Sequence, residues 1–178
     1  MTVRKAPTSG TLDLKIKASA VLDEAGQDQG IVTAYVSVFG NVDSFGDVVM
    51  PDAFADDVAS FEAGEKSIPV IWSHQRQDPD AFLGEVTGLK EDETGLLVTM
   101  KFDMDEPKSA KAYRLVKSGR VNQWSFAYKT IEGAWVETTD AAYYELRKLS
   151  LREVGPTLVG ANDLTRTVDA KSAERWFA

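Results

Sequence analysis

Residues 68–74 read Ile68-Pro69-Val70-Ile71-Trp72-Ser73-His74 and contain the only histidine of the 178 residues. Three of the first four residues are β-branched, which predicts a short buried strand. His74 stands where that strand ends, before the polar and turn-prone residues 75–80. Because a strand end holds a side chain rigidly while the loop leaves room for a substrate, His74 is a candidate general base. The alternative is a histidine that caps the strand and bonds a carbonyl.

The composition narrows the class of protein. The net charge is −8, which argues against nucleic acid as the main partner, because phosphate binding needs clustered Lys and Arg. Cysteine is absent and histidine occurs once, so we expect no disulfide, no thiol nucleophile, no metal site and no cofactor. No apolar run reaches membrane-spanning length, and residues 1–10 lack the apolar core of a signal peptide. We therefore expect a protein without a membrane partner, intracellular or packed inside an assembly.

The hydrophobic pattern predicts a single domain rich in strands. Residues 1–10 are expected to form a flexible N-terminal segment, residues 11–170 the domain, and residues 171–178 a C-terminal tail. Strand-like patterns occupy residues 11–19, 31–39, 82–89, 96–102, 123–131, 134–138 and 142–151, with a further short strand at Leu158 and Val159. Helical patterns occupy residues 51–64 and 107–118. Because strands outnumber helices and do not alternate with them, we expect an α+β protein, mainly β: a mixed β-barrel with helices packed outside.

Ser125 is the best-placed hydroxyl for a nucleophile. Without cysteine, a nucleophile paired with a histidine base must be serine or threonine. On a strand, Ser125 faces opposite to its bulky neighbours Trp124 and Phe126, so it faces a cleft or solvent if the rings are in the core. Ser73 ranks lower, since it points away from His74 if the strand continues. An ordinary outward-facing strand serine is the alternative reading of Ser125.

Glu153 is the candidate third group that would orient the histidine. It lies at the end of an apolar strand, just before Gly155 and Pro156, which predict a turn. Asp43 and Asp47, in the polar loop of residues 40–47, are next in line. The alternative role for Glu153 is a surface salt bridge with a neighbouring basic residue.

The order of several short motifs resembles the prohead maturation protease family of tailed bacteriophages, serine proteases similar in fold to the herpesvirus assemblins. The motifs are residues 40–54, Ile71-Trp72-Ser73-His74, Leu83-Gly84-Glu85-Val86, Trp124-Ser125-Phe126-Ala127-Tyr128, Leu151-Arg152-Glu153-Val154 and Leu158-Val159-Gly160-Ala161-Asn162. The resemblance covers about residues 30 to 165. The assemblins use a second histidine as third member, which this chain cannot supply.

The resemblance implies a serine endopeptidase with an acyl-enzyme mechanism. His74 would be the base, Ser125 the nucleophile and Glu153 the orienting acid. It implies that the substrates are scaffold and capsid-protein segments and the protease itself, inside the immature capsid in the host cytoplasm. A homo-oligomer stays open, as do the cleavage sequence, the oxyanion-hole donors and whether Ala178 is a natural terminus.

Two other classes of function stay open on the residues alone. One is a catalytically silent domain on the same barrel that binds capsid or scaffold protein. The other is a small-ligand-binding barrel whose pocket is lined by Trp72, Trp124 and Tyr128.

Overall fold

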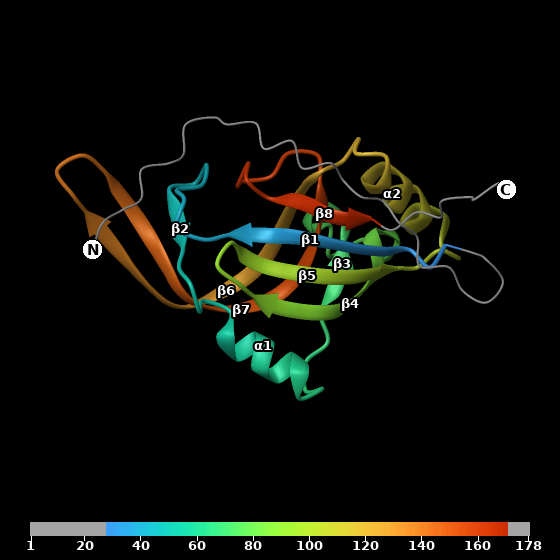
Figure 1. Cartoon of the computed structure of the whole chain (residues 1–178), viewed down its shortest axis with the longest axis horizontal. Helices are drawn as coiled ribbons and strands as arrows, with labels where there is room; N and C mark the ends of the chain where they lie inside the picture. The colour runs from blue at the N-terminus through green and yellow to red at the C-terminus, as the bar shows by residue number, and fades with distance from the viewer. Residues whose placement is uncertain (1–27, 171–178) are drawn as a thin grey trace, which may run out of the picture.

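The computed structural model describes residues 28–170 of the chain (Figure 1). The described strands are β1 (Ile31–Val38), β2 (Asp47–Val49), β3 (Pro69–Ile71), β4 (Phe82–Glu91), β5 (Gly95–Phe102), β6 (Gln123–Glu137), β7 (Ala142–Thr157) and β8 (Arg166–Ala170). The helices are α1 (Ala55–Glu62) and α2 (Pro107–Lys117), with 3-10 turns η1 (Trp72–His74) and η2 (Pro79–Ala81). The predicted strand at residues 11–19, N-terminal segment and C-terminal tail lie outside the described residues.

The strands form one mixed sheet flanked by two helices, as predicted. Its order is β2-β7-β3-β4-β5-β1-β8, with β6 paired to β7. Strands β2 and β3 run parallel to β7, whereas the other pairs are antiparallel. Within the described chain the ladder does not close into a barrel. Side-chain bonds join β6 to the β8 region instead: Thr165 and Thr167 bond the Trp124 backbone and indole N–H at 3.0–3.1 Å.

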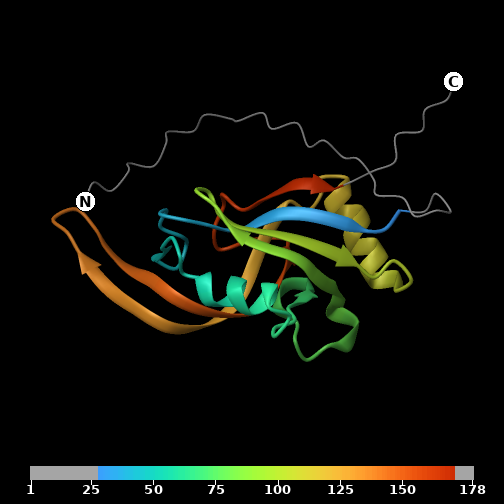
Figure 2. The same cartoon turned by 60° about the horizontal axis from the view of Figure 1, so that its bottom comes forward.

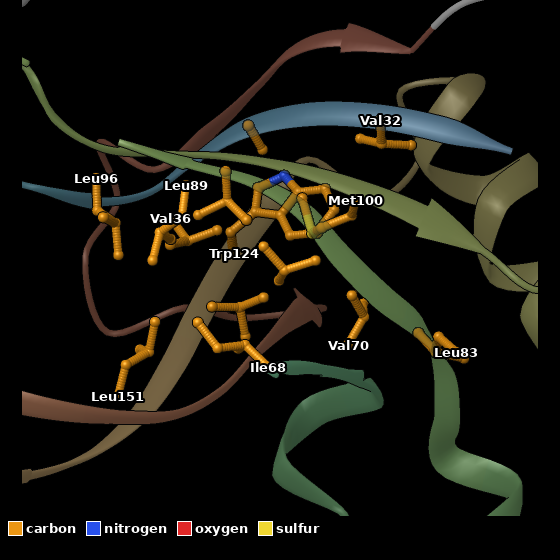
Figure 3. Close-up of a cluster of buried hydrophobic side chains, with 14 of the residues drawn as sticks. Val32, Val36, Ile68, Val70, Leu83, Leu89, Leu96, Met100, Trp124 and Leu151 are labelled. Carbon is orange, nitrogen blue, oxygen red and sulfur yellow. The ribbon is translucent and has the colours of Figure 1, made fainter. Parts of the chain in front are cut away.

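The core lies on the concave side of the curved sheet, around Trp124 (Figure 3). The predicted strand at residues 31–39 is confirmed as β1, in which Val32, Ala34 and Val36 are fully buried. Trp124 is also only 1% exposed, so its buried ring anchors the start of β6 in the core. Figures 1 and 2 show the far halves of β6 and β7 as a hairpin arm that extends beyond this core.

Both predicted helices are present. Helix α2 ends at Lys117, and Gly119 follows with a φ of +72°, the left-handed conformation typical of the residue after a helix. Helix α1 is shorter than predicted, and its buried residue is the unexpected Asp57. The Asp57 carboxylate accepts the Leu151 N–H at 2.7 Å and pairs with Lys66, so a charged group fastens α1 to β7. No helix among residues 28–170 is long and apolar enough to cross a membrane.

Three boundaries differ from the predictions around the C-terminal strands. The two segments expected at residues 123–131 and 134–138 form the single strand β6. Strand β7 runs on to Thr157, so Gly155 and Pro156 lie inside a strand and form no turn. The predicted strand at Leu158 and Val159 is wrong: both residues lie in the loop after β7, 69% and 82% exposed. Pairing with both β6 and β3 extends β7, which residue propensities alone could not indicate.

Candidate active site

The backbone turns sharply immediately before His74. Strand β3 ends at Ile71, and Ser73 and His74 then take φ angles of +44° and +62°. Left-handed backbone at two successive non-glycine residues costs free energy, so neighbouring contacts must hold it in place. The turn is closed by the Gln75 N–H, which donates to the Trp72 carbonyl at 3.0 Å. The prediction that His74 stands where its strand ends is confirmed.

A β-bulge directs Glu153 toward His74. Leu149 and Leu151 on β7 are buried in the core, so strict alternation would send residue 153 into the core as well. Instead the β6–β7 register shifts at Arg152, and Val154 takes the core position. Glu153 therefore faces the opposite side of the ladder, as β-bulges next to functional sites often arrange.

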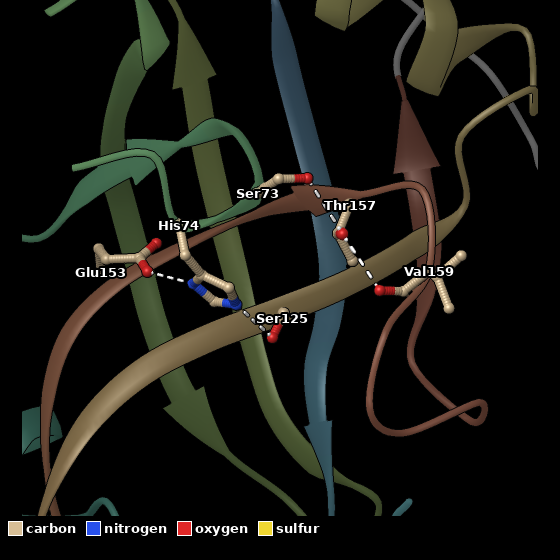
Figure 4. Close-up of polar contacts among 6 residues, drawn as sticks. All are labelled: Ser73, His74, Ser125, Glu153, Thr157 and Val159. Atoms are coloured by element: carbon tan, nitrogen blue, oxygen red, sulfur yellow. Dashed lines mark hydrogen bonds and ion pairs between the residues drawn. The ribbon is translucent and has the colours of Figure 1, made fainter. Parts of the chain in front are cut away.

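Ser125 and Glu153 are diagonal neighbours on that same side. Ser125 pairs across the ladder with Gly155, and Ala127 pairs with Glu153. Diagonal neighbours on paired strands lie within reach of a long side chain. The imidazole of His74 lies between Ser125 and Glu153 (Figure 4). The predicted orientation of Ser125, opposite to the buried Trp124, is confirmed.

The structure brings the three predicted residues into one hydrogen-bonded line (Figure 4). His74 Nε2 is 2.8 Å from Ser125 Oγ, and His74 Nδ1 bonds Glu153 Oε1. An ionised carboxylate only accepts hydrogen bonds, so Nδ1 carries the proton that points to Glu153. Nε2 is then free to accept the Ser125 hydroxyl proton. The line runs from solvent to interior, because the His74 side chain is 40% exposed and Glu153 only 1%.

Gly155 permits the close approach of β3 to β7. A Cβ atom built on Gly155 would lie 1.7 Å from the Ile71 carbonyl oxygen, which is a severe clash. Any side chain here would push away the end of β3, and with it the turn that carries His74. This requirement was missed from the sequence, where Gly155 was interpreted as part of a turn.

Ser73 hydrogen-bonds neither His74 nor Ser125 but a residue at the end of β7. Its hydroxyl donates to Thr157 Oγ1 at 3.1 Å, and Thr157 donates in turn to the Val159 carbonyl at 3.2 Å (Figure 4). Thr157 is 8% exposed and joins the turn of His74 to the end of β7. Sequence reasoning missed Thr157, because its partner lies 84 residues away.

Asp43 and Asp47, the other candidates for the third member, bond within the loop before β2 and to Tyr128, not to His74. Asp43 Oδ1 accepts the N–H groups of Phe45 and Asp47 at 2.8 and 3.0 Å and so shapes the loop before β2. Burial and the Asp43 charge raise the pKa of Asp47, which hydrogen-bonds Tyr128. Burial and the two carboxylates raise the pKa of Tyr128 to about 12. No group of three metal-binding side chains occurs within residues 28–170.

The three aromatic residues proposed for a ligand pocket do not share one. Trp124 is buried in the core, and Tyr128 contacts Asp47. Trp72 lines a cavity beside α2 without either of them. The hypothesis of a ligand-binding barrel built on these rings is therefore wrong.

The chemistry available to this arrangement is acyl transfer. A serine hydroxyl, an imidazole that can accept its proton, and a buried carboxylate that fixes the tautomer of the ring are the three parts of a serine nucleophile site. Glu153 Oε2 has no hydrogen-bond partner among the described residues, so the imidazole is the main group that stabilises this buried charge.

Comparison with known proteins agrees with this geometry. Residues 13–176 match the family described as caudovirus prohead serine protease. The prohead protease of Enterobacteria phage HK97 is 25% identical over 147 residues, which are 82% of this chain and 62% of that protein. The chain thus spans less than two thirds of that relative's length.

Two solved structures are similar to this chain to different degrees. The capsid assembly protease gp21 of bacteriophage T4 has a TM-score of 0.58 at 10% identity, over 80% of this chain and 90% of that one. The KSHV protease, solved with a hexapeptide phosphonate inhibitor, has a TM-score of 0.49 at 14% identity, over 77% and 63%. The T4 likeness shows the fold, and the match over residues 13–176 shows the family. The chain belongs to the caudovirus prohead serine protease family.

Proposed function

We propose that this protein is a serine endopeptidase that cleaves scaffold and capsid-protein segments, and itself, inside the immature capsid of a tailed phage. The observation that supports the proposal is the hydrogen-bonded line from Ser125 through His74 to the buried Glu153, in a chain of this family. The relatives' names, a prohead protease and a capsid assembly protease, support capsid protein as a substrate. Scaffold segments as substrates and the host cytoplasm as the location belong to the same proposal.

The proposed mechanism assigns one role to each residue. Ser125 Oγ attacks the scissile carbonyl while His74 Nε2 takes the hydroxyl proton. Glu153 keeps the proton on Nδ1 and stabilises the imidazolium that forms. The ring then gives its proton to the leaving amine, and water attacks the acyl-enzyme by the same route in a second step.

A serine-directed fluorophosphonate tests this proposal directly. The wild-type protein should be labelled once, at Ser125, as read from the intact mass and a peptide digest. Ser125→Ala and His74→Ala should lose labelling and also lose cleavage of co-expressed capsid protein. Ser125→Ala should stay folded because its side chain is small, whereas His74→Ala leaves the buried Glu153 without its partner, so its fold is checked by a melting curve. Ser150→Ala, on β7 but outside the line, is the matched control.

The same experiment separates the proposal from a silent capsid-binding domain. Folded wild-type protein that resists the probe and leaves capsid and scaffold proteins intact would identify such a domain. Labelling at a serine other than Ser125 would overturn the residue assignment while keeping the class of enzyme.

A further inference from the structure

An apolar cavity lies beside the candidate active site and has no part in the chemistry assigned above. Its volume is about 350 Å³, within the range of pockets that bind small groups. Trp72, Leu83, Ala112, Leu115 and Leu158 form its apolar walls. The cavity therefore suits an apolar group rather than an ion.

The walls of this cavity are continuous with the segments that build the active site. Trp72 precedes His74 by two residues in the same turn, and Leu158 directly follows Thr157. The hydrogen bond from Ser73 to Thr157 joins these two segments. A chain held at Ser125 thus passes close to the cavity.

The separation from Ser125 corresponds to a few residues of extended peptide. Ser125 pairs with Gly155, and Leu158 follows three residues later. At about 3.3 Å per residue, β7 covers about 7 Å from Gly155 to its last residue Thr157, and Leu158 is the next residue, in the loop. An extended substrate covers this separation in about three residues.

The charged groups at the rim balance one another. Lys108 pairs with Asp80 at 2.6 Å, and Lys111 and Asp78 also line the cavity. Two acidic and two basic groups give no net charge, so selection depends on apolar contact. Leu158 stays 69% exposed although it is apolar, as expected for a wall that an incoming side chain covers.

We propose that this cavity is a specificity subsite that takes a large apolar side chain, such as leucine, methionine or phenylalanine, from the substrate within about three or four residues of the cleaved bond. This inference rests on the proposed protease function and adds the substrate class. Burying such a side chain favours an apolar over a small residue at that position by about ten- to a hundredfold in kcat/KM.

Digestion of a peptide library derived from a whole bacterial proteome tests the subsite. Mass spectrometry of the products gives the residue preference at four positions on each side of every cut. The wild-type protein should show enrichment of large apolar residues at one position. Leu158→Ala should reduce that enrichment about tenfold, whereas Val159→Ala, 82% exposed and outside the cavity, should leave it unchanged.

The small fluorophosphonate, which reaches Ser125 without filling the cavity, separates the two proposals. A wild-type protein that the fluorophosphonate does not label would overturn the protease function itself. Normal labelling without apolar enrichment at any position, whether peptides are cut indifferently or remain uncut, would overturn only the subsite. Equal loss of preference in Leu158→Ala and Val159→Ala would also overturn it.

Discussion

Glu153 is almost completely buried, yet only one of its carboxylate oxygens has a described partner, the His74 ring. Under the proposed mechanism, this group is kept in the interior for its effect on that ring. Glu153→Gln keeps the shape but removes the charge, and its amide can donate to Nδ1 and favour the wrong tautomer. We expect kcat/KM to fall by roughly ten- to a thousandfold. This is less than the roughly ten-thousandfold loss that follows removal of the acid's charge from a Ser-His-Asp triad.

The single histidine makes this prediction easy to check. Nitrogen-15 spectra of the only imidazole in the chain show directly which ring nitrogen carries the proton. The wild type should carry it on Nδ1, and the variant should show a changed tautomer together with the slower rate. Unchanged rate and tautomer would mean that the site works as a pair of Ser125 and His74.

At the scale of elements, the turn η1 depends on a contact with the end of β7. Thr157→Val removes the hydroxyl that accepts from Ser73 at nearly constant volume. It also removes the hydrogen bond that Thr157 donates to the Val159 carbonyl. We expect labelling of Ser125 to slow by roughly tenfold, the equivalent of the one lost bond that reaches the turn of His74. Thr157→Ser keeps the hydroxyl and should restore most of the rate. If both variants slow equally, or if the loss only follows the melting temperature, the contact does not position His74.

The spacing between β3 and β7 depends on Gly155 having no side chain. Gly155→Ala places a Cβ against the Ile71 carbonyl, so β3 and its turn must move. We expect the distance from His74 to Ser125 to increase and cleavage to fall by at least about a hundredfold, as misplacement by about 1 Å does. The substitution Ala127→Gly, on the facing strand, is the comparison variant. A fully active Gly155→Ala protein would show that β3 can move without disturbing the site.

At the scale of the whole molecule, Asp28 fastens the segment before β1 to α2. Its carboxylate accepts from Tyr113 Oη at 2.7 Å, Lys117 Nζ at 2.6 Å and the Gly30 N–H at 3.0 Å. Burial raises the pKa of Asp28, but these hydrogen bonds and the Lys117 charge outweigh it and hold the pKa below its usual value. A lowered carboxyl pKa stabilises the fold above the unfolded value and ceases to do so as the pH falls through the folded value.

Asp28→Asn should therefore destabilise the protein more at neutral pH than in acid. Urea unfolding at pH about 7 and about 3 should give a difference in the free energy of unfolding from the wild type that is larger at the higher pH. Asp140→Asn, at the exposed tip of the β6–β7 arm, is the control. A difference that is equal at both pH values would show that the ionised carboxylate of Asp28 does not stabilise the fold.

The sequence by itself determined what depends on local pattern and on residue type. Strand-like patterns predicted β4, β5 and most other strands, and the helical pattern at residues 107–118 predicted α2. The absence of cysteine and the single histidine reduced the choice of nucleophile and base to a few residues. The interrupted alternation of Leu149, Leu151 and Val154 was a further signal, which could have revealed the bulge.

Only the tertiary structure decided how these residues meet. His74 is 51 residues from Ser125 and 79 residues from Glu153 along the chain. No local pattern encodes contacts at such sequence separations. The meeting depends on pairing of β7 with both β6 and β3, on a bulge at Arg152, and on the close packing at Gly155. These features arise because strands are stabilised mainly by their neighbours in the sheet, so partner strands, and not residue propensities, fix where β7 ends and where Glu153 points.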